Sequence, residues 1–236
     1  MSQISPRRRS VFTSRLVRTD DGQPRVAEDL RRAILAGDEP PGTLIPIEAV
    51  ARFFGVSQIP VREALKVLLG EGLVEHVPHI GYSVAKLTFA EFCELYDVRE
   101  ALERQALTHA VPVAGPEDHA EARRQHAEIA AAMDGGDERG YHAATRAFHL
   151  ALMVPADMQR LVHMYENAWN MTEPARPMSH VEHGDRRVLH EDHERMLAAY
   201  VAGDTATVLA ECQAHYAHLR EAVEAMAGDP DTFRTA

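Results

Sequence analysis

The chain has few cysteines and no long apolar run, and each shortage excludes a class of protein. Its 236 residues include two cysteines, Cys93 and Cys212, which are too few for a disulfide framework and lack the CxxC spacing of many metal sites. No apolar stretch approaches the roughly 18 to 20 residues that cross a bilayer. Behind Arg7, Arg8 and Arg9 there is no apolar segment and no cleavage site. We therefore expect a cytoplasmic protein without membrane association.

The chain also lacks the positive charge that is common in nucleic-acid-binding proteins. Its formal net charge is −11, but the acid is concentrated in the second part. Residues 1–87 hold 12 Lys and Arg against 10 Asp and Glu, whereas the remainder holds 13 against 26. Because phosphate contacts are local, a mildly basic first part can bind DNA while the acidic part discourages non-specific association. The net charge therefore neither excludes nor establishes DNA binding. The length of the chain and the uneven distribution of its acidic residues predict two domains.

Residues 25–87 show the pattern of three short helices followed by a hairpin. Apolar side chains recur at helical spacing in segments 25–37, 47–54 and 57–69. Ser57 is a favourable N-cap for the third helix, which turns one apolar face inward. Segments 73–77 and 82–84 predict short strands joined by a turn. We expect residues 1–24, which lack such periodicity, to form a flexible arm.

This arrangement is typical of a winged helix-turn-helix, in which the third helix enters the major groove of DNA. Any three-helix core gives similar periodicity, so particular residues must decide. Five ordered blocks are Leu30-Arg-Arg-Ala-Ile-Leu-Ala-Gly37, Pro41-Gly-Thr43, Val56-Ser57, Pro60-Val-Arg-Glu-Ala-Leu65 and Glu71-Gly-Leu-Val-Glu75. In this order and at these separations, they closely resemble the DNA-binding domain of GntR-family regulators.

The resemblance implies which side chains contact DNA. Arg62, at the exposed start of the recognition helix, is expected to contact a guanine edge or a phosphate. The other expected DNA-binding residues are Lys66, Gln58, Ser57, Arg52, His79 and Gly81. The sequence departs from the family at Gln58 and Ile59, where arginine and threonine are common, and Gln58 could instead read adenine. In the wing, His76, His79 and Ile80 replace frequent arginines. We therefore expect a divergent site preference and a weak or pH-sensitive contact between the wing and the DNA backbone.

Residues 88–228 predict an all-α domain, and residues 229–236 a tail. Helical stretches are expected at about 88–110, 117–133, 138–153, 156–172, 185–202 and 204–227. No strand pattern and no internal repeat interrupts them. The predicted fold class is therefore mainly α: an N-terminal winged helix-turn-helix at residues 25–87 and a C-terminal all-α bundle of six or seven helices.

Three of the fourteen histidines lie on apolar stripes of different predicted helices: His149, His193 and His215. A buried imidazole needs a hydrogen-bond partner or a metal, and neutral imidazoles that converge from several helices suit zinc, nickel or a similar divalent ion. Alternatively, each imidazole forms a hydrogen bond with a separate neighbouring residue and no metal is bound. His142 lies seven residues before His149 on nearly the same helix face, and we interpret it as structural.

Four sparse motifs in this second part resemble the helical effector domain of the FadR subfamily: Val98-Arg-Glu-Ala-Leu-Glu103, Arg146-Ala-Phe-His149, Glu191-Asp-His193 and Ala214-His215. The resemblance implies that the three histidines bind a divalent metal and that a small carboxylate binds beside it. An aspartate ligand of that subfamily is replaced here by Thr145, which lowers the charge of the site. Arg99 is implied as the partner of the effector carboxylate, and an ion pair with Glu103 is the alternative.

The sequence therefore predicts a ligand-responsive, DNA-binding transcription regulator and not an enzyme. We expect a homodimeric repressor whose effector changes the fit of two reading heads to a palindromic operator. A metal-dependent hydrolase would use the same histidines, but no carboxylate is positioned as a base. An interaction module that does not bind DNA is the third hypothesis, and Arg62 and Lys66 argue against it.

Overall fold

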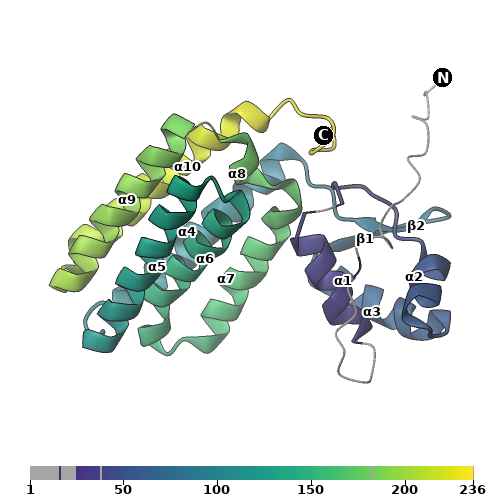
Figure 1. Ribbon diagram of the computed structural model, residues 1–236, viewed down its shortest axis with the longest axis horizontal. Coiled ribbons are helices and arrows are strands. Elements are labelled where there is room, and N and C mark those ends of the chain that lie inside the picture. The colour runs from purple at the N-terminus through teal and green to yellow at the C-terminus, as the bar shows by residue number, and fades with distance from the viewer. Residues whose placement is uncertain (1–15, 17–24, 38, 182, 236) are drawn as a thin grey trace. The chain divides into compact units, whose positions relative to one another are not determined.

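The computed structural model describes residues 16, 25–37, 39–181 and 183–235 (Figure 1). They form two compact units, of which the first combines residues up to 88 with segments 173–175 and 230–236. The second comprises 89–172 and 176–229. The expected arm, 1–24, lies outside the described residues except for Leu16, which packs into the core of the first unit.

The first unit is built from three helices and a hairpin: α1 (Val26–Leu35), α2 (Ile47–Phe54), α3 (Gln58–Gly70), β1 (Val74–Val77) and β2 (Gly81–Val84). Helices α1 and α2 both pack against α3. The expected inward stripe of α3, Val61, Ala64, Leu65 and Leu68, is buried. Removing these apolar side chains from water is the main favourable term for a core of this size. The predicted winged helix-turn-helix is confirmed.

The wing is a two-stranded antiparallel sheet in which Val74 lies opposite Val84 and Val77 opposite Gly81. Its turn needs unusual backbone conformations, with φ of 65° at His79 and 120° at Gly81. Histidine adopts the left-handed region more readily than most non-glycine residues, and glycine does so without steric cost. The turn therefore presents its tip to solvent.

Within residues 229–236, which the sequence predicted as a tail, segment 230–235 is tied to the end of the first unit. The backbone N–H of Arg234 donates to the Leu87 carbonyl at 2.9 Å, and Lys86 Nζ donates to the Pro230 carbonyl at 2.7 Å. The Phe233 side chain is buried. These contacts give the last residues a defined place in the first unit.

The second unit contains seven α-helices among the described residues: α4 (Phe89–Ala110), α5 (Pro116–Gly135), α6 (Glu138–Met153), α7 (Gln159–Thr172), α8 (Pro177–His180), α9 (His183–Ala202) and α10 (Thr205–Val223). Short 3-10 turns, η2 (Val154–Ala156) and η4 (Glu224–Met226), follow α6 and α10, and η3 (Glu173–Ala175) belongs to the first unit. Helix α4 packs against α6, α7 and α10, and α9 against α5 and α10. The expected all-α bundle is confirmed.

Short polar and glycine signals set several helix ends in this bundle. Asp137 and Asp204 accept hydrogen bonds from the backbone N–H groups of Gly140, at 2.9 Å, and Thr207, at 3.1 Å, and so cap α6 and α10. Gly136, with φ of 66°, ends α5 in the left-handed conformation. In the part of the chain that the structure describes, no helix combines the length and apolar character needed to cross a membrane.

Candidate metal centre and nucleic-acid interface

The three histidines predicted to face inward meet inside the second unit. His149 comes from α6, His193 from α9 and His215 from α10, and one ring nitrogen of each lies within 4.8 Å of the others. All three side chains are buried, with at most 2% exposed. Helices α6 and α10 pack against α4, and α9 packs against α10, so that residues distant in sequence converge on one point. Among the described residues, this is the one group of three histidines, cysteines or carboxylates that could hold a metal ion together.

Several ring nitrogens of this cluster are buried without a hydrogen-bond partner among the described residues. They are Nε2 of His149, both nitrogens of His193 and Nδ1 of His215. Burial lowers the pKa of His193 well below its usual value, and the nearby rings of His215 and His149 add to the effect. Burial also lowers the pKa of His215. The His193 and His215 imidazoles are therefore neutral near pH 7 and have lone pairs to donate, so the donor set fits a divalent metal such as zinc or nickel.

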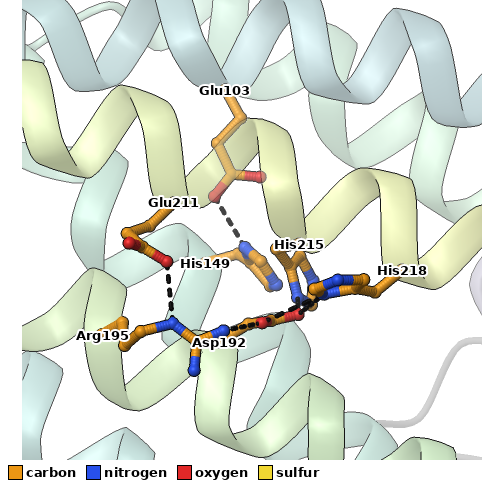
Figure 2. Close-up of polar contacts among 7 residues, drawn as sticks. All are labelled: Glu103, His149, Asp192, Arg195, Glu211, His215 and His218. Carbon is orange, nitrogen blue, oxygen red and sulfur yellow. Dashed lines mark hydrogen bonds and ion pairs between the residues drawn. The ribbon is translucent and has the colours of Figure 1, made fainter.

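Glu103 of α4 lies directly behind His149 and is completely buried (Figure 2). Its Oε1 is 2.6 Å from His149 Nδ1, and its Oε2 accepts from the hydroxyls of Tyr165 at 3.2 Å and Tyr216 at 2.8 Å. Burial alone would raise the pKa of Glu103, but the His149 imidazole and the Tyr216 hydroxyl outweigh it and hold the pKa below its ordinary value. Glu103 is therefore an ionised carboxylate inside the bundle.

A second buried carboxylate, Asp192 of α9, lies beside His215 (Figure 2). Its Oδ2 is 2.9 Å from His218 Nδ1 and 3.5 Å from His215 Nδ1, and its Oδ1 pairs with Arg195. The pKa of Asp192, which burial would raise, is lowered by His215 and His218. The negative charge of Asp192 is thus shared among three basic groups, His215, His218 and Arg195. Arg195 also pairs with Glu211.

Thr145 occupies the position one turn before His149 on α6 and is buried. Its hydroxyl has no hydrogen-bond partner among the described residues. A neutral hydroxyl is a weak ligand, so this position adds no charge to the cluster. His142, one further turn away, is half-buried with its ring edge-on to Trp169 at 6.4 Å, and it is not part of the three-histidine group.

Arg99 of α4 is buried in a cage of aromatic rings. Its guanidinium carbon lies 3.6 Å from the ring centre of Trp169, with Tyr96, Tyr165 and Tyr216 at 4.9, 5.7 and 5.9 Å. Burial alone would lower its pKa, but the surrounding tyrosines keep the pKa of Arg99 above its ordinary value. Cation–π contacts stabilise such a group without neutralising it.

The predicted alternative for Arg99, an ion pair with Glu103, is wrong. Glu103 is held instead by His149 and two tyrosines, and no carboxylate among the described residues pairs with Arg99. Arg99 Nε has no hydrogen-bond partner there. Trp169, which contacts Arg99, also lies near the histidines, with its ring centre 5.8 Å from that of His149. A buried cation without an anion therefore lies one ring away from the three-histidine cluster.

The outer face of α3 presents the side chains expected to read DNA. Gln58, Ile59 and Arg62 are exposed, and Ile59 is 71% exposed although it is apolar. Arg62 has no carboxylate partner in the described part of the chain, whereas Lys66 pairs with Glu63 at 2.8 Å. Arg62 is therefore the freer of the two cations on this face.

Other expected DNA contacts flank that face. Ser57 is the N-cap residue of α3, as the sequence predicted, and its hydroxyl makes no capping hydrogen bond. Arg52 of α2 is exposed and pairs with Glu48 at 3.4 Å. In the wing, His79 and Ile80 are exposed. His76 packs against Tyr82, with ring centres 4.6 Å apart, and is held on the hairpin.

Both units match protein families of one class of regulator. Residues 23–84 match the model described as bacterial regulatory proteins, gntR family, and residues 94–218 match the FCD domain. The chain belongs to the GntR family of transcription regulators. Its FCD domain places it in the FadR-like subfamily, as the sequence motifs indicated. Members of this family regulate transcription and are not enzymes, so the expectation of a non-enzyme is confirmed.

Individual relatives agree with this assignment. The GntR regulator is 30% identical over 199 residues to the probable D-xylose utilization operon transcriptional repressor of Paenarthrobacter nicotinovorans, covering 81% of this chain and 84% of that protein. Among solved structures, it matches E. coli McbR/YncC with a TM-score of 0.71 and 26% identity, over 83% of this chain and 95% of that one. A putative GntR regulator from Rhodococcus sp. RHA1 shares the fold, with a TM-score of 0.74 at 23% identity over 84% and 95% of the two chains.

Several residues that sequence reasoning missed have partners far away in sequence, such as Glu103 with His149 and Asp192 with His218. Glu103 was considered only as a partner of Arg99, and Asp192 appeared only inside a motif. The aromatic residues around Arg99 were not identified at all. A signal existed for Glu103, because an acidic residue four positions after Arg99 falls on the same buried helix face.

Proposed function

We propose that this GntR regulator is a repressor controlled by a small carboxylate that binds beside a metal in its FCD domain. The observation that carries the proposal is the buried three-histidine cluster with unpaired nitrogens, one aromatic ring away from a buried arginine that has no anionic partner among the described residues. Leaving such groups unpaired in a protein interior is costly, and a bound metal and anion would satisfy both.

In the proposed site, His149, His193 and His215 hold the metal, with zinc or nickel as the best match to neutral imidazole ligands. When bound, the metal supplies a Lewis-acidic position that a carboxylate oxygen can occupy. Arg99 binds and orients the carboxylate through its guanidinium, which Trp169 fixes by stacking. The Thr145 hydroxyl lies on the same face of α6 as His149 and is available to a water or to the effector.

The DNA-binding part of the proposal assigns the reading role to the outer face of α3 and to the wing. Arg62, without a carboxylate partner in the described chain, contacts a base edge or phosphate, and a good bidentate base contact contributes about 1–3 kcal/mol. Gln58 reads adenine, and the exposed Ile59 beside it suits the methyl group of thymine. The remaining contacts are assigned to Lys66, Ser57, Arg52, His79 and Gly81. Two copies of the chain would occupy the two halves of a palindromic operator.

Two measurements test this proposal. Elemental analysis of protein purified without added metal should give about one ion per chain, and a protein that stays metal-free after addition of zinc or nickel would overturn the metal assignment. Fluorescence anisotropy with DNA from the protein's own promoter region, at two salt concentrations, should show binding that weakens as salt rises. Absence of salt-dependent binding would overturn the reading-head assignment and favour an interaction module.

A further inference from the structure

The metal cluster combines three neutral ligands with two buried carboxylates that are not ligands. Neither Glu103 nor Asp192 belongs to the group of atoms that could hold the ion, yet each lies against one of its histidines. We propose that Glu103 is a positioning residue for this centre: it fixes the proton of His149 on Nδ1, directs Nε2 toward the metal, and supplies the negative charge that the ligands lack. The proposal rests on the metal function proposed above.

The hydrogen bonds around Glu103 determine the tautomer of His149. An ionised carboxylate only accepts hydrogen bonds, and Glu103 already accepts from the hydroxyls of Tyr165 and Tyr216. At 2.6 Å from Glu103 Oε1, His149 Nδ1 must therefore be the donor. With Nδ1 engaged by Glu103, Nε2 is the nitrogen whose lone pair His149 can offer to a metal. This is the nitrogen of His149 that has no partner among the described residues.

The contact between Glu103 and His149 also places a negative charge close to the proposed ion. A divalent ion at His149, His193 and His215 would lie in a water-excluded interior among neutral imidazoles, with the neutral Thr145 hydroxyl one turn from His149. Opposite charges attract strongly when little water screens them, so a carboxylate one imidazole away favours the ion. Carboxylates that accept from the outer nitrogen of a metal-bound histidine also raise the basicity of that ligand.

Glu103 is better placed for this role than Asp192. The Asp192 carboxylate is 3.5 Å from His215 Nδ1, which is too long to satisfy that nitrogen, and its charge is shared with Arg195 and His218. The Glu103 carboxylate contacts His149 at 2.6 Å, and its other hydrogen bonds among the described residues come from the neutral hydroxyls of Tyr165 and Tyr216. Its charge is therefore directed to His149.

Metal affinity of a charge-removing variant tests the inference. Zinc and nickel affinities should be measured by competition with a chromogenic chelator for wild type, Glu103→Gln and Glu100→Gln. Glu100 is a matched control because it is a carboxylate on the same helix that pairs with Arg220 and Arg104 instead of a cluster histidine. We expect Glu103→Gln to weaken binding about 10- to 100-fold, the usual effect of losing such a carboxylate, and Glu100→Gln to change it less than about threefold. Equal affinities of wild type and Glu103→Gln would overturn the proposal.

A second readout needs neither a variant nor a metal. Long-range ¹H–¹⁵N NMR spectra of the metal-free wild-type protein should show a proton held on Nδ1 of His149. Absence of a proton from Nδ1, or rapid exchange between the two tautomers, would overturn the positioning role of Glu103. Failure of the wild type to bind either metal would instead contradict the proposed metal function, and the NMR result would still decide whether Glu103 orients His149.

Discussion

Replacement of His193 by leucine should stabilise the metal-free protein, the opposite of what most substitutions in a core do. His193 is completely buried, and neither of its ring nitrogens has a hydrogen-bond partner among the described residues. Its ring packs against those of Phe148, His149 and His215, with centres 5.1, 5.0 and 4.5 Å apart. Leucine fills a similar volume and has no polar atoms that need partners.

The size of the effect follows from the two unpaired nitrogens. Each buried polar group without a partner costs about 1–3 kcal/mol. A substitution of similar volume loses less than about 1.5 kcal/mol through imperfect packing. The net gain in the free energy of unfolding is therefore at least about 0.5 kcal/mol and centrally about 2.5 kcal/mol. For a chain of this size, a gain of about 2.5 kcal/mol raises the melting temperature by roughly 5–10 °C.

The assay is thermal unfolding in a chelator and again with excess zinc, with His149→Leu as the matched control. His149→Leu removes the imidazole that donates to Glu103 at 2.6 Å, so it should destabilise the chelated protein by about 1.5–3 kcal/mol, the value of a hydrogen bond to a charged group. Zinc at a hundred times its dissociation constant should stabilise the wild-type protein by about 2.7 kcal/mol. It should stabilise neither variant, because each lacks one of the proposed ligands. A His193→Leu protein that melts below wild type in chelator would refute the reasoning, since it would mean that the His193 nitrogens are satisfied.

Four other substitutions test the remaining assignments. Arg62→Ala should weaken operator binding about 10- to 100-fold in anisotropy titrations. Lys66→Ala should weaken it less than tenfold, because the Lys66 ammonium already pairs with Glu63. Equal losses of affinity in the two variants would contradict the assignment of the base contact to Arg62. Arg99→Met should abolish the thermal stabilisation that small carboxylates such as citrate give the zinc-loaded protein, without lowering its zinc affinity in chelator competition; a retained carboxylate response would contradict its role. Thr145→Asp should tighten zinc binding by placing a charged oxygen one turn from His149, and an unchanged affinity would show that this position does not face the ion.

The sequence predicts most of the fold because periodicity reports which face of each helix is buried. The stripe containing Val61, Leu65 and Leu68 and the inward positions of the three histidines follow from helical spacing alone. Helix α8 was missed because its four residues, Pro177–His180, complete barely one turn and carry no periodic pattern. Ser57 is the N-cap residue of α3 as predicted, although its hydroxyl makes no capping hydrogen bond, because N-cap propensity does not require that the side chain make the bond.

The environment of the site could not be predicted in the same way, because it depends on pairs that only tertiary packing creates. His149 and Glu103 are 46 residues apart, and Tyr216 and Glu103 are 113 apart. Periodicity states that each of these side chains points inward, but not which of them meet. The sequence therefore could not show whether Glu103 pairs with Arg99, and the contacts of Glu103 with His149, Tyr165 and Tyr216 show that it does not.

The contacts of Arg99 and the histidines also bear on how the proposed metal and carboxylate would influence each other. Arg99 and the ion are both positive and both lie near Trp169 in a buried region, so the presence of one makes the other less favourable. Glu103 offsets the ion through His149, but no carboxylate among the described residues offsets Arg99. An anion that contacts both cations would remove this repulsion, so it would bind more tightly when the metal is present and would tighten the metal in turn, because such coupling is reciprocal. The charge arrangement alone therefore favours an effector that is an anion and disfavours a neutral one.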